Sequence, residues 1–461
     1  MQPESDTIAA VATAMNQGGI NIIRISGQKS MQIIDEIFTG KGKKNVSQAE
    51  SHTVHYGHIV DKEQIVDEVM VLILKSPRTY TKEDVVEIDC HGGIVVTKRI
   101  LDLVLEHGAR LAEPGEFTKR AFLNGRIDLS QAEAVMDVIA SKNEYALKNS
   151  MAQLNGKMKR TIEDMREFIL HDIAYIEAAL DDPEHIDLDG FSDILKGHVN
   201  DCKEKIISLL NTADNGRLLR EGVKTAIVGK PNAGKSSLLN FMLGEDRAIV
   251  TDIAGTTRDT LEENMNLGGI LLNMVDTAGI RDTDDLVEQI GVDKARKCVQ
   301  DADLVLYVVD NSVPLDENDE QIIPILLKQQ KKVIILLNKS DLESKVDVDL
   351  LKNRLPFPVI QMSAKEEEGM DELTKEINCL FFQGSLKGSE GMVVTNARHQ
   401  EALRNTKSSL DKVLESIEQM MPEDFYTIDL MEAYQSLGVI IGEQVEDDLV
   451  DKIFKDFCMG K

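Results

Sequence analysis

The glycine-rich segment at residues 229–236 constrains this chain more than any other stretch. It reads Gly-Lys-Pro-Asn-Ala-Gly-Lys-Ser, with an apolar run before it and helix-forming residues after it, which is the order strand, turn, helix. In that geometry backbone N–H groups and a helix N-terminus point toward one position, Lys235 can reach the β- and γ-phosphates of a ligand, and the Ser236 hydroxyl can bind Mg²⁺. The segment predicts a polyphosphate site. A pattern this short also occurs in ordinary glycine turns, so companion motifs must decide.

Composition places the chain among globular proteins of two to three domains. Its 461 residues exceed one ordinary core, and no apolar run approaches the roughly 18 residues that a membrane-spanning helix needs. The first residues lack the basic and apolar regions of a signal peptide, and the five cysteines are scattered and odd in number, which fits reduced thiols. We therefore expect a cytoplasmic protein with no membrane association. The net charge of −28 argues against a broad phosphate-binding surface, so a nucleic acid would need a local basic patch or a basic partner.

Hydrophobic patterning predicts a multidomain chain in four segments. They are an α+β domain at 1–118, an all-α helical domain in two parts at 119–220 and 381–461, and an inserted α/β domain at 221–380 with a parallel sheet covered on both faces. The inserted segment alternates strands and helices, and its continuous apolar runs at 304–309 and 333–337 are typical of buried parallel strands.

Finer expectations follow from the same patterning. In the first domain the pattern predicts strands at 20–25, 69–74 and 85–88 and helices at 31–38 and after Gly93. In the helical domain we expect the third helix to end at Asn215-Gly216, where a residue with positive φ is wanted, and a flexible linker at 384–391.

Two other features have a functional and a structural interpretation. His91 could bind a ligand, but beside a Gly-Gly turn a structural hydrogen bond is the better hypothesis. The acidic segment 181–189 could be mistaken for a metal loop, and we interpret it as a solvated connection between helices.

Three motifs follow the glycine-rich segment in the order and spacing that one nucleotide site requires. A threonine-rich loop at 251–259 could complete the Mg²⁺ shell, Asp276-Thr277-Ala278-Gly279 follows an apolar strand, and Asn338-Lys339-Ser340-Asp341 ends another. The residues assigned to this site are Asn232, Ala233, Gly234, Lys235, Ser236, Ser237, Thr251, Asp252, Ile253, Ala254, Gly255, Thr256, Thr257, Asp276, Thr277, Ala278, Gly279, Asn338, Lys339, Ser340, Asp341, Ser363, Ala364 and Lys365.

The last of these motifs selects the base. The Asp341 carboxylate can accept hydrogen bonds from N1–H and the exocyclic amine of guanine, whereas adenine offers no such pair of donors. Ser363-Ala364-Lys365 would add a backbone N–H toward the guanine oxygen. The combined motifs resemble a Ras-like GTPase domain, which implies a Ras-like α/β fold with a doubly wound sheet for the inserted segment. The phosphate loop with Gly-Thr-Thr-Arg-Asp resembles a bacterial subgroup that includes ribosome-assembly GTPases. Ile280 stands where Ras-like proteins carry a water-orienting glutamine, so another group must position the attacking water. Asn232 offers a carbonyl oxygen near which a monovalent cation could bind, or it simply stabilises the loop.

Over its full length the chain resembles the MnmE (TrmE) family of tRNA-modification GTPases, of the TrmE-Era-EngA-like group. The resemblance rests on residues 21–27, on 113–124, on the inserted GTPase segment and on the ending Cys458-Met459-Gly460-Lys461, which matches the family's Cys-x-Gly-Lys.

The resemblance implies a reaction and its partners. The family works with an FAD-binding partner, MnmG (GidA), to place an aminomethyl or carboxymethylaminomethyl group on C5 of the wobble uridine (U34) of certain tRNAs. The one-carbon unit comes from a methylene- or formyl-tetrahydrofolate held by an N-terminal domain that also forms the homodimer. By motif match the folate contacts fall on Arg24, Glu87, Arg126 and Lys461, and Cys458 is a candidate catalytic residue.

The resemblance also implies how the GTPase site works. Potassium would be bound by Asn232 with oxygens of Thr251, Ile253 and Thr256, and Mg²⁺ by Ser236 and Thr257. The family's remote catalytic glutamate falls on Glu288, which would orient the attacking water through a bridging water.

Two further hypotheses of function stay open at this point. The chain could be a GTPase switch or scaffold in ribosome or ribonucleoprotein assembly, although an assembly factor would carry a basic RNA-binding domain. It could also be a folate-dependent methyltransferase with a vestigial GTPase domain, which the intact nucleotide motifs disfavour.

Overall fold

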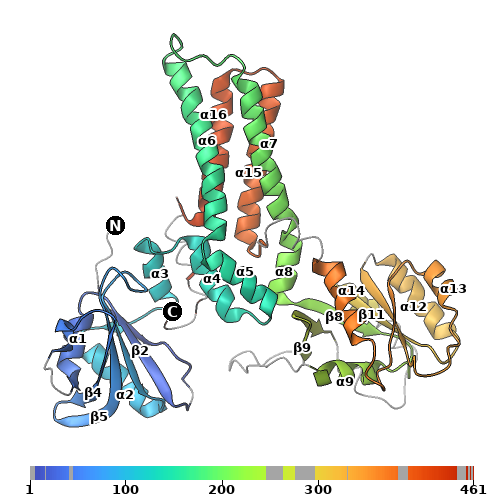
Figure 1. Ribbon diagram of the computed structural model, residues 1–461, viewed down its shortest axis with the longest axis horizontal. Coiled ribbons are helices and arrows are strands. Elements are labelled where there is room, and N and C mark those ends of the chain that lie inside the picture. Colours follow the sequence, from blue (N-terminus) through green and yellow to red (C-terminus); the bar gives the residue numbers. More distant parts are fainter. Residues whose placement is uncertain are drawn as a thin grey trace. The chain divides into compact units, whose positions relative to one another are not determined.

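The computed structural model describes residues 6–15, 17–40, 45–245, 263–275, 296–329, 331–382 and 393–443, together with Ile453, Phe454, Phe457 and Gly460. The chain forms two compact units (Figure 1). The first comprises residues 1–136, 154–166 and 437–461, and the second comprises 137–153 and 167–436. Among the described residues no helix is long and apolar enough to cross a membrane.

The first unit contains a seven-stranded sheet in the order β3-β4-β5-β6-β2-β1-β7. The strands are β1 (Ile8–Val11), β2 (Ile20–Ser26), β3 (Phe38–Gly40), β4 (Thr53–Asp61), β5 (Gln64–Leu74), β6 (Val85–His91) and β7 (Arg110–Leu111). All neighbours are antiparallel except β1 and β7. The predicted strands at 20–25, 69–74 and 85–88 are confirmed.

Helices cover the sheet of the first unit with their apolar sides. These helices are α1 (Ser30–Ile37) and α2 (Ile94–Glu106). The short helix η1 (Val46–Gln48) lies between them in the chain, and α3 (Glu116–Leu123) and α4 (Leu129–Ala140) follow α2. Ile33 and Ile34 of α1 and Ile100 of α2 share one core with Ile23 and Ile88 of the strands. His91 lies at the end of β6, where its Nδ1 lies 2.7 Å from Asp67 Oδ1, so its structural interpretation is supported.

Helices of the second unit pack side by side around apolar stripes. They are α5 (Glu144–Leu154), α6 (Lys157–Asp181), α7 (Phe191–Asn211), α8 (Ala213–Glu221), α15 (Ala397–Glu418) and α16 (Glu423–Ile441), with α5, α6 and α16 mostly in this unit. Figure 1 shows α6, α7, α15 and α16 side by side. Cross-helix contacts include Tyr175 against Phe191, Lys203 with Asp411, and Ser409 with Glu432. The acidic segment 181–189 connects α6 to α7, and the described residues include no group of three or more metal-binding side chains.

The predicted helix end at Asn215-Gly216 is wrong. α7 ends at Asn211, and residues 215 and 216 lie inside α8, which ends before Gly222 at φ 90°. Gly216 is required for another reason, because a Cβ there would lie 2.2 Å from the carbonyl oxygen of Val394. The chain's return after the inserted segment therefore packs directly on this glycine. The linker predicted at 384–391 lies outside the described residues.

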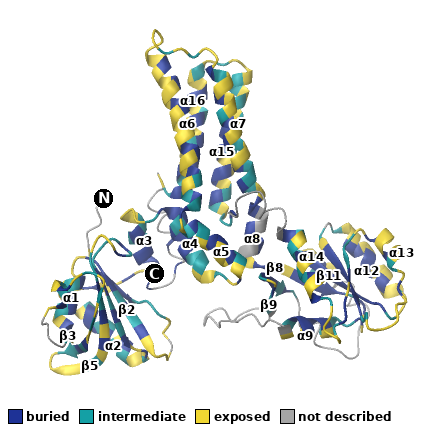
Figure 2. Cartoon of the chain, viewed as in Figure 1, coloured by how far each residue is buried: buried dark blue, intermediate teal, exposed yellow. Residues whose placement is uncertain are grey.

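A six-stranded sheet in the order β13-β12-β11-β8-β10-β9 forms the other half of the second unit. Its strands are β8 (Val223–Val228), β9 (Glu263–Leu267), β10 (Ile270–Met274), β11 (Leu304–Asp310), β12 (Lys332–Asn338) and β13 (Val359–Gln361). Every pair is parallel except β9 with β10. The runs predicted as buried strands are β11 and β12, and Figure 2 shows this sheet as dark blue, buried residues between more exposed helices.

Helices cover both faces of this sheet, as the doubly wound fold requires. They are α9 (Lys235–Glu245), α12 (Glu317–Lys328), α13 (Val348–Arg354) and α14 (Met370–Phe382). Leu238 and Leu373 belong to the core on one face, and Ile323 and Leu351 to the core on the other. The chain moves from β8 to β10 on one side and then to β11 on the other. The carboxyl end of β8 is therefore a topological switch point, which is where such sheets bind ligands.

Candidate functional site

The glycine-rich segment leaves β8 at the switch point and ends where α9 begins. Asn232 has φ 61° and Gly234 has φ 96°, so the loop turns through left-handed backbone conformations. A Cβ on Gly234 would lie 2.0 Å from Asn338 Nδ2, which makes glycine obligatory at this close approach. The loop is a cradle of backbone N–H groups at a helix N-terminus, which is the arrangement that binds phosphate.

Lys235 opens α9 with its ammonium group turned back over this cradle. Its Nζ donates to the carbonyl oxygens of Gly229, at 2.8 Å, and Lys230, at 2.7 Å. Burial lowers the pKa of Lys235 below its ordinary value. An anionic phosphate placed here would favour the charged ammonium, since an opposite charge opposes the effect of burial.

The motif that ends β12 is hydrogen-bonded directly to the phosphate loop. Asn338 Nδ2 donates to the carbonyl oxygen of Ala233 at 2.9 Å, and Asn338 Oδ1 accepts from the Ala364 N–H at 3.2 Å. Lys339 Nζ donates to the carbonyl oxygen of Asn232 at 3.1 Å and to Asp310 Oδ2 at 2.5 Å. Asn338 thus connects the phosphate loop, the end of β12 and the segment at Ala364, although residues 233 and 364 lie more than a hundred positions apart in the sequence.

A cavity of about 780 Å³ lies between these segments. Asp341 lies on its wall, and its Oδ1 accepts a hydrogen bond from Ser363 Oγ at 2.7 Å. The predicted residues that line the cavity are Gly234, Ser237, Asn338, Lys339, Asp341, Ser363, Ala364 and Lys365. Asn240, Phe241, Leu342 and Glu367 line it as well and were not predicted. The space joins an acceptor-only carboxylate to a phosphate cradle, so it suits a base with paired N–H donors that carries phosphates.

Sequence reasoning missed the residue that anchors the phosphate loop. Lys230 Nζ donates to Asp319 Oδ2 at 2.9 Å and to Asp316 Oδ2 at 3.0 Å, and the Lys230 side chain is only 7% exposed. Tyr307 donates through its hydroxyl to Asp319 Oδ1 at 2.9 Å. Burial opposes the charge on Lys230, but the hydrogen bonds from its ammonium to Asp319 and Asp316 outweigh burial and raise its pKa. The sequence signal that could have predicted this anchor is a lysine inside the glycine-rich loop together with the acidic residues at the start of α12.

Several predicted site residues lie outside the described residues. These are the loop residues Thr251, Asp252, Ile253, Ala254, Gly255, Thr256 and Thr257, the motif Asp276, Thr277, Ala278 and Gly279, and Glu288. Of the predicted potassium and magnesium ligands, the structure describes Asn232 and Ser236.

A second group of predicted residues meets in the first unit. Arg24 on β2 and Glu87 on β6 are cross-strand neighbours, and Arg24 Nε donates to Glu87 Oε1 at 2.7 Å. The Tyr80 ring lies 5.7 Å from the Arg24 guanidinium and 4.7 Å from that of Arg126. The Phe117 ring is 5.6 Å from Arg24. Tyr80 and Phe117 were not predicted.

The end of the chain also reaches this cluster. Arg24 Nη1 donates to the carbonyl oxygen of Gly460 at 3.0 Å. Phe457 packs against Phe454, with ring centroids 4.9 Å apart. Cys458 and Lys461 flank these positions in sequence and lie outside the described residues. Arginines, a glutamate and aromatic rings together suit a flat ligand that carries anionic and hydrogen-bonding groups.

Two family models match this chain. "MnmE helical domain" matches residues 129–458, and "GTP-binding protein TrmE N-terminus" matches residues 7–126. The first match spans the six-stranded sheet as well as the helices on both sides of it. Both halves of the described structure therefore fall within one family.

Full-length relatives carry the same name. A tRNA modification GTPase MnmE of Lachnoclostridium phytofermentans is 56% identical over 99% of this chain and 100% of its own length. Proteins of that name are 48% identical in Clostridioides difficile, over 99% of each chain, and 47% identical in Bacillus subtilis, over 99% of this chain and 100% of the relative.

Solved structures match a smaller part. The G domain of the T. maritima FeoB iron transporter is 31% identical, covers 34% of this chain and 96% of its own, and has a TM-score of 0.25. Membership of the family is carried by the full-length relatives and the family models.

Proposed function

We propose that this chain, which belongs to the MnmE family of tRNA modification GTPases, hydrolyses GTP in the course of tRNA modification. The observation that carries the proposal is the direct link between phosphate cradle and base pocket. Asn338 bonds the loop at Ala233, while Asp341 lines the same cavity. A ligand that satisfies both has N–H donors on its base and phosphates at the other end, as GTP does.

Hydrolysis is proposed to depend on potassium. With Ile280 in place of a glutamine, charge beside the β- and γ-phosphates has to come from elsewhere. Asn232, held in a left-handed conformation beside Lys339, would bind potassium with oxygens of Thr251, Ile253 and Thr256. Ser236 and Thr257 would bind Mg²⁺, and Glu288 would orient the attacking water.

The modification itself is proposed to occur at C5 of the wobble uridine, with the FAD-dependent partner MnmG. Arg24, Glu87, Arg126 and Lys461 would hold a methylene- or formyl-tetrahydrofolate, which supplies the one-carbon unit when bound. The Arg24–Glu87 pair and the cation–π contacts around Tyr80 support this assignment. We further propose the division into domains at 1–118, 119–220, 221–380 and 381–461, and a homodimer formed by the first of them.

Cation dependence tests the hydrolytic part of the proposal. GTP turnover is expected to be at least about tenfold faster in potassium than in sodium. In sodium the site would lack the potassium ion, which is the group proposed to stabilise the charge that develops on the phosphates. Asn232→Ala should abolish the difference and keep GDP binding. Equal rates in the two salts would contradict the cation site.

Cys458→Ser tests the modification part. The variant should keep wild-type GTP turnover, because residue 458 is far from the phosphate loop in sequence and belongs to the other unit. Nucleoside analysis of tRNA incubated with the variant and the flavoprotein should show a loss of modified uridine. Unchanged modification would remove Cys458 from the reaction.

A further inference from the structure

The ring of Tyr80 lies close to two guanidinium groups of the first unit. Its centroid is 5.7 Å from the guanidinium carbon of Arg24 and 4.7 Å from that of Arg126. The ring packs against the small apolar core that contains Phe117, and the Tyr80 hydroxyl forms a hydrogen bond with Thr118 Oγ1 at 2.9 Å. Packing and this hydrogen bond therefore hold the ring in one place, whatever the arginines do.

The two arginines differ in what balances their charge. Arg24 Nε donates to Glu87 Oε1 at 2.7 Å, and both of these side chains are less than a fifth exposed. Arg126 is exposed, and it makes no ion pair within the part of the chain that the structure describes. Its guanidinium is held over the face of Tyr80 instead, which is the geometry of a cation–π contact. Arg126 thus keeps its charge available for an anion.

A segment beside this ring also holds the loop that carries Arg126. Asn124 Nδ2 donates to the carbonyl oxygen of Thr81 at 2.6 Å, and Lys82 Nζ donates to the carbonyl oxygen of Gly125 at 3.0 Å. Lys82 has φ 59°, a left-handed conformation that is uncommon for a residue with a side chain. Contacts from three consecutive residues of one segment therefore fix three consecutive residues of the other.

The proposed folate ligand has two chemically different ends. Its pterin ring carries neighbouring N–H donors, and its glutamate tail carries carboxylates that are ionised at neutral pH. Glu87 offers acceptor oxygens, which suit the pterin donors, whereas Arg126 offers an unpaired cation, which suits the tail. The reverse placement would set the tail carboxylates against the Glu87 carboxylate.

We propose that Tyr80 is a positioning residue, which holds Arg126 toward the glutamate carboxylates of the folate while Glu87 binds the pterin. This inference rests on the proposed folate site and adds the direction in which the ligand lies. A guanidinium stacked on a ring keeps its N–H edge free for paired hydrogen bonds to a carboxylate. An aliphatic residue at position 80 would let the Arg126 side chain move among rotamers, and ordering it again would weaken ligand binding.

Titration of the full-length protein with two ligands tests the proposal. They are 5-formyl-tetrahydrofolate and 5-formyl-tetrahydropteroate, which lacks the glutamate. Tyr80→Leu should weaken binding of the folate at least about fivefold and leave binding of the pteroate nearly unchanged. Tyr80→Phe keeps the ring and should bind both ligands as the wild type does. A variant that folds poorly would lose affinity for both ligands, so the selective loss separates positioning from stability.

A second variant tests whether Tyr80 acts through Arg126. Arg126→Gln should also weaken binding of the folate and spare the pteroate. Adding Tyr80→Leu to it should cause little further loss, because both changes remove the same interaction.

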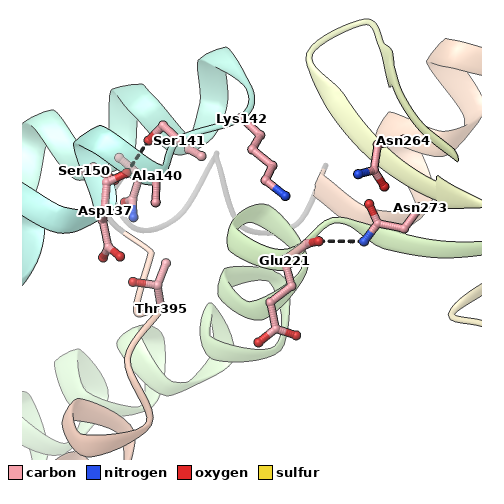
Figure 3. A pocket seen from close by; sticks show the side chains of 11 residues that line it. Asp137, Ala140, Ser141, Lys142, Ser150, Glu221, Asn264, Asn273 and Thr395 are labelled. Atoms are coloured by element: carbon pink, nitrogen blue, oxygen red, sulfur yellow. Dashed lines mark hydrogen bonds between the residues drawn. The ribbon is translucent and has the colours of Figure 1, made fainter. Parts of the chain in front are cut away.

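The matched control for the loss of a positive charge is Lys142→Gln. Lys142 is exposed and lines a separate cavity of the second unit, together with residues of α8 and of the β9–β10 hairpin (Figure 3). This variant should bind both ligands with wild-type affinity.

The contrary outcomes separate this inference from the folate assignment. Equal weakening of both ligands in Tyr80→Leu would overturn the role of Tyr80 and leave the folate site standing. Additive losses in the double variant with Arg126→Gln would do the same. Failure of the wild-type protein to bind either ligand would overturn the folate assignment and this inference with it.

Discussion

Among the residues of the predicted nucleotide motifs, Asp341 is the one carboxylate that lines the described cavity beside the phosphate loop. Its Oδ1 accepts a hydrogen bond from Ser363 Oγ at 2.7 Å. Asp341→Asn replaces one acceptor oxygen by an N–H donor. The variant should then prefer xanthine, whose carbonyl oxygen stands where guanine has its amine. Mismatched buried donors and acceptors of this kind commonly cost about a hundredfold or more in turnover efficiency. Steady-state hydrolysis of GTP and XTP measures the change.

The same experiment has a clear contrary outcome. If Asp341→Asn hydrolyses GTP as efficiently as the wild type and gains nothing toward XTP, the cavity does not read the base through this residue. Lys352→Ala serves as the control, because its side chain is exposed on α13 and does not line the cavity. It should change the GTP to XTP preference little.

Asp319 anchors the phosphate loop from beneath. It is fully buried and accepts hydrogen bonds from Lys230, from Tyr307 and from the Asp316 N–H at 3.1 Å. Asp319→Asn removes the charge that compensates Lys230, so the free energy of unfolding should fall by about 3 kcal/mol. Urea denaturation measures it. The control is Glu320→Gln on the same helix, because Arg354, the ion-pair partner of Glu320, is exposed. A loss of unfolding free energy in this control as large as that in Asp319→Asn would contradict the anchoring role.

At the scale of elements, α3 is tied to the start of β1 and to β7 by an ion network. Arg110 donates to Glu116 and Asp6, and Arg120 donates to the same two carboxylates. Burial would raise the pKa of Glu116, but hydrogen bonds from Arg110, the Glu113 N–H and Arg120 outweigh it and hold the pKa below its ordinary value. The pKa of Asp6 is lowered too, as its bonds to both arginines outweigh burial.

The sign of the resulting pH dependence follows from these lowered pKa values. Carboxyls that are more acidic in the folded state stabilise it at neutral pH, and this stability is lost as pH falls through their folded pKa values. The melting temperature should therefore drop from about pH 5 downward, and Glu116→Gln should flatten the slope. Glu113→Gln, on an exposed side chain, is the control. An unchanged slope in Glu116→Gln would show that the Glu116 carboxylate does not contribute to this pH dependence.

Elements with strong patterns were predictable and those fixed by contacts were not. β11 and β12 are continuous apolar runs, so their sequences indicate buried parallel strands. β4 was not predicted: its threonine, valines, tyrosine and isoleucine suit a strand, but two histidines and a glycine interrupt the apolar pattern, and the pairing with β3 and β5 defines the strand. Gly216 resembled a helix end, but its small size is needed where Val394 passes over α8. Local signals do not contain such distant contacts.

At the scale of the whole molecule, the sequence predicted one helical domain interrupted by a GTPase segment, and the α7–α15 ion pair shows helices from both sides of that segment in contact. Eight residues assigned to the nucleotide site from their motifs line one cavity, and those assigned at 251–257 and 276–279 lie outside the described residues. Lys230, Tyr80 and Phe117 were missed, since their roles come from neighbours that only folding supplies.

We propose that GTP hydrolysis in this site drives tRNA modification. The most direct measurement is the modified-uridine content of tRNA incubated with the protein, the proposed flavoprotein partner and either GTP or XTP. With wild type the modified nucleoside should form with GTP, and with Asp341→Asn it should form with XTP and fall at least about tenfold with GTP. Equal modification by both proteins with either nucleotide, or with none, would contradict the claim.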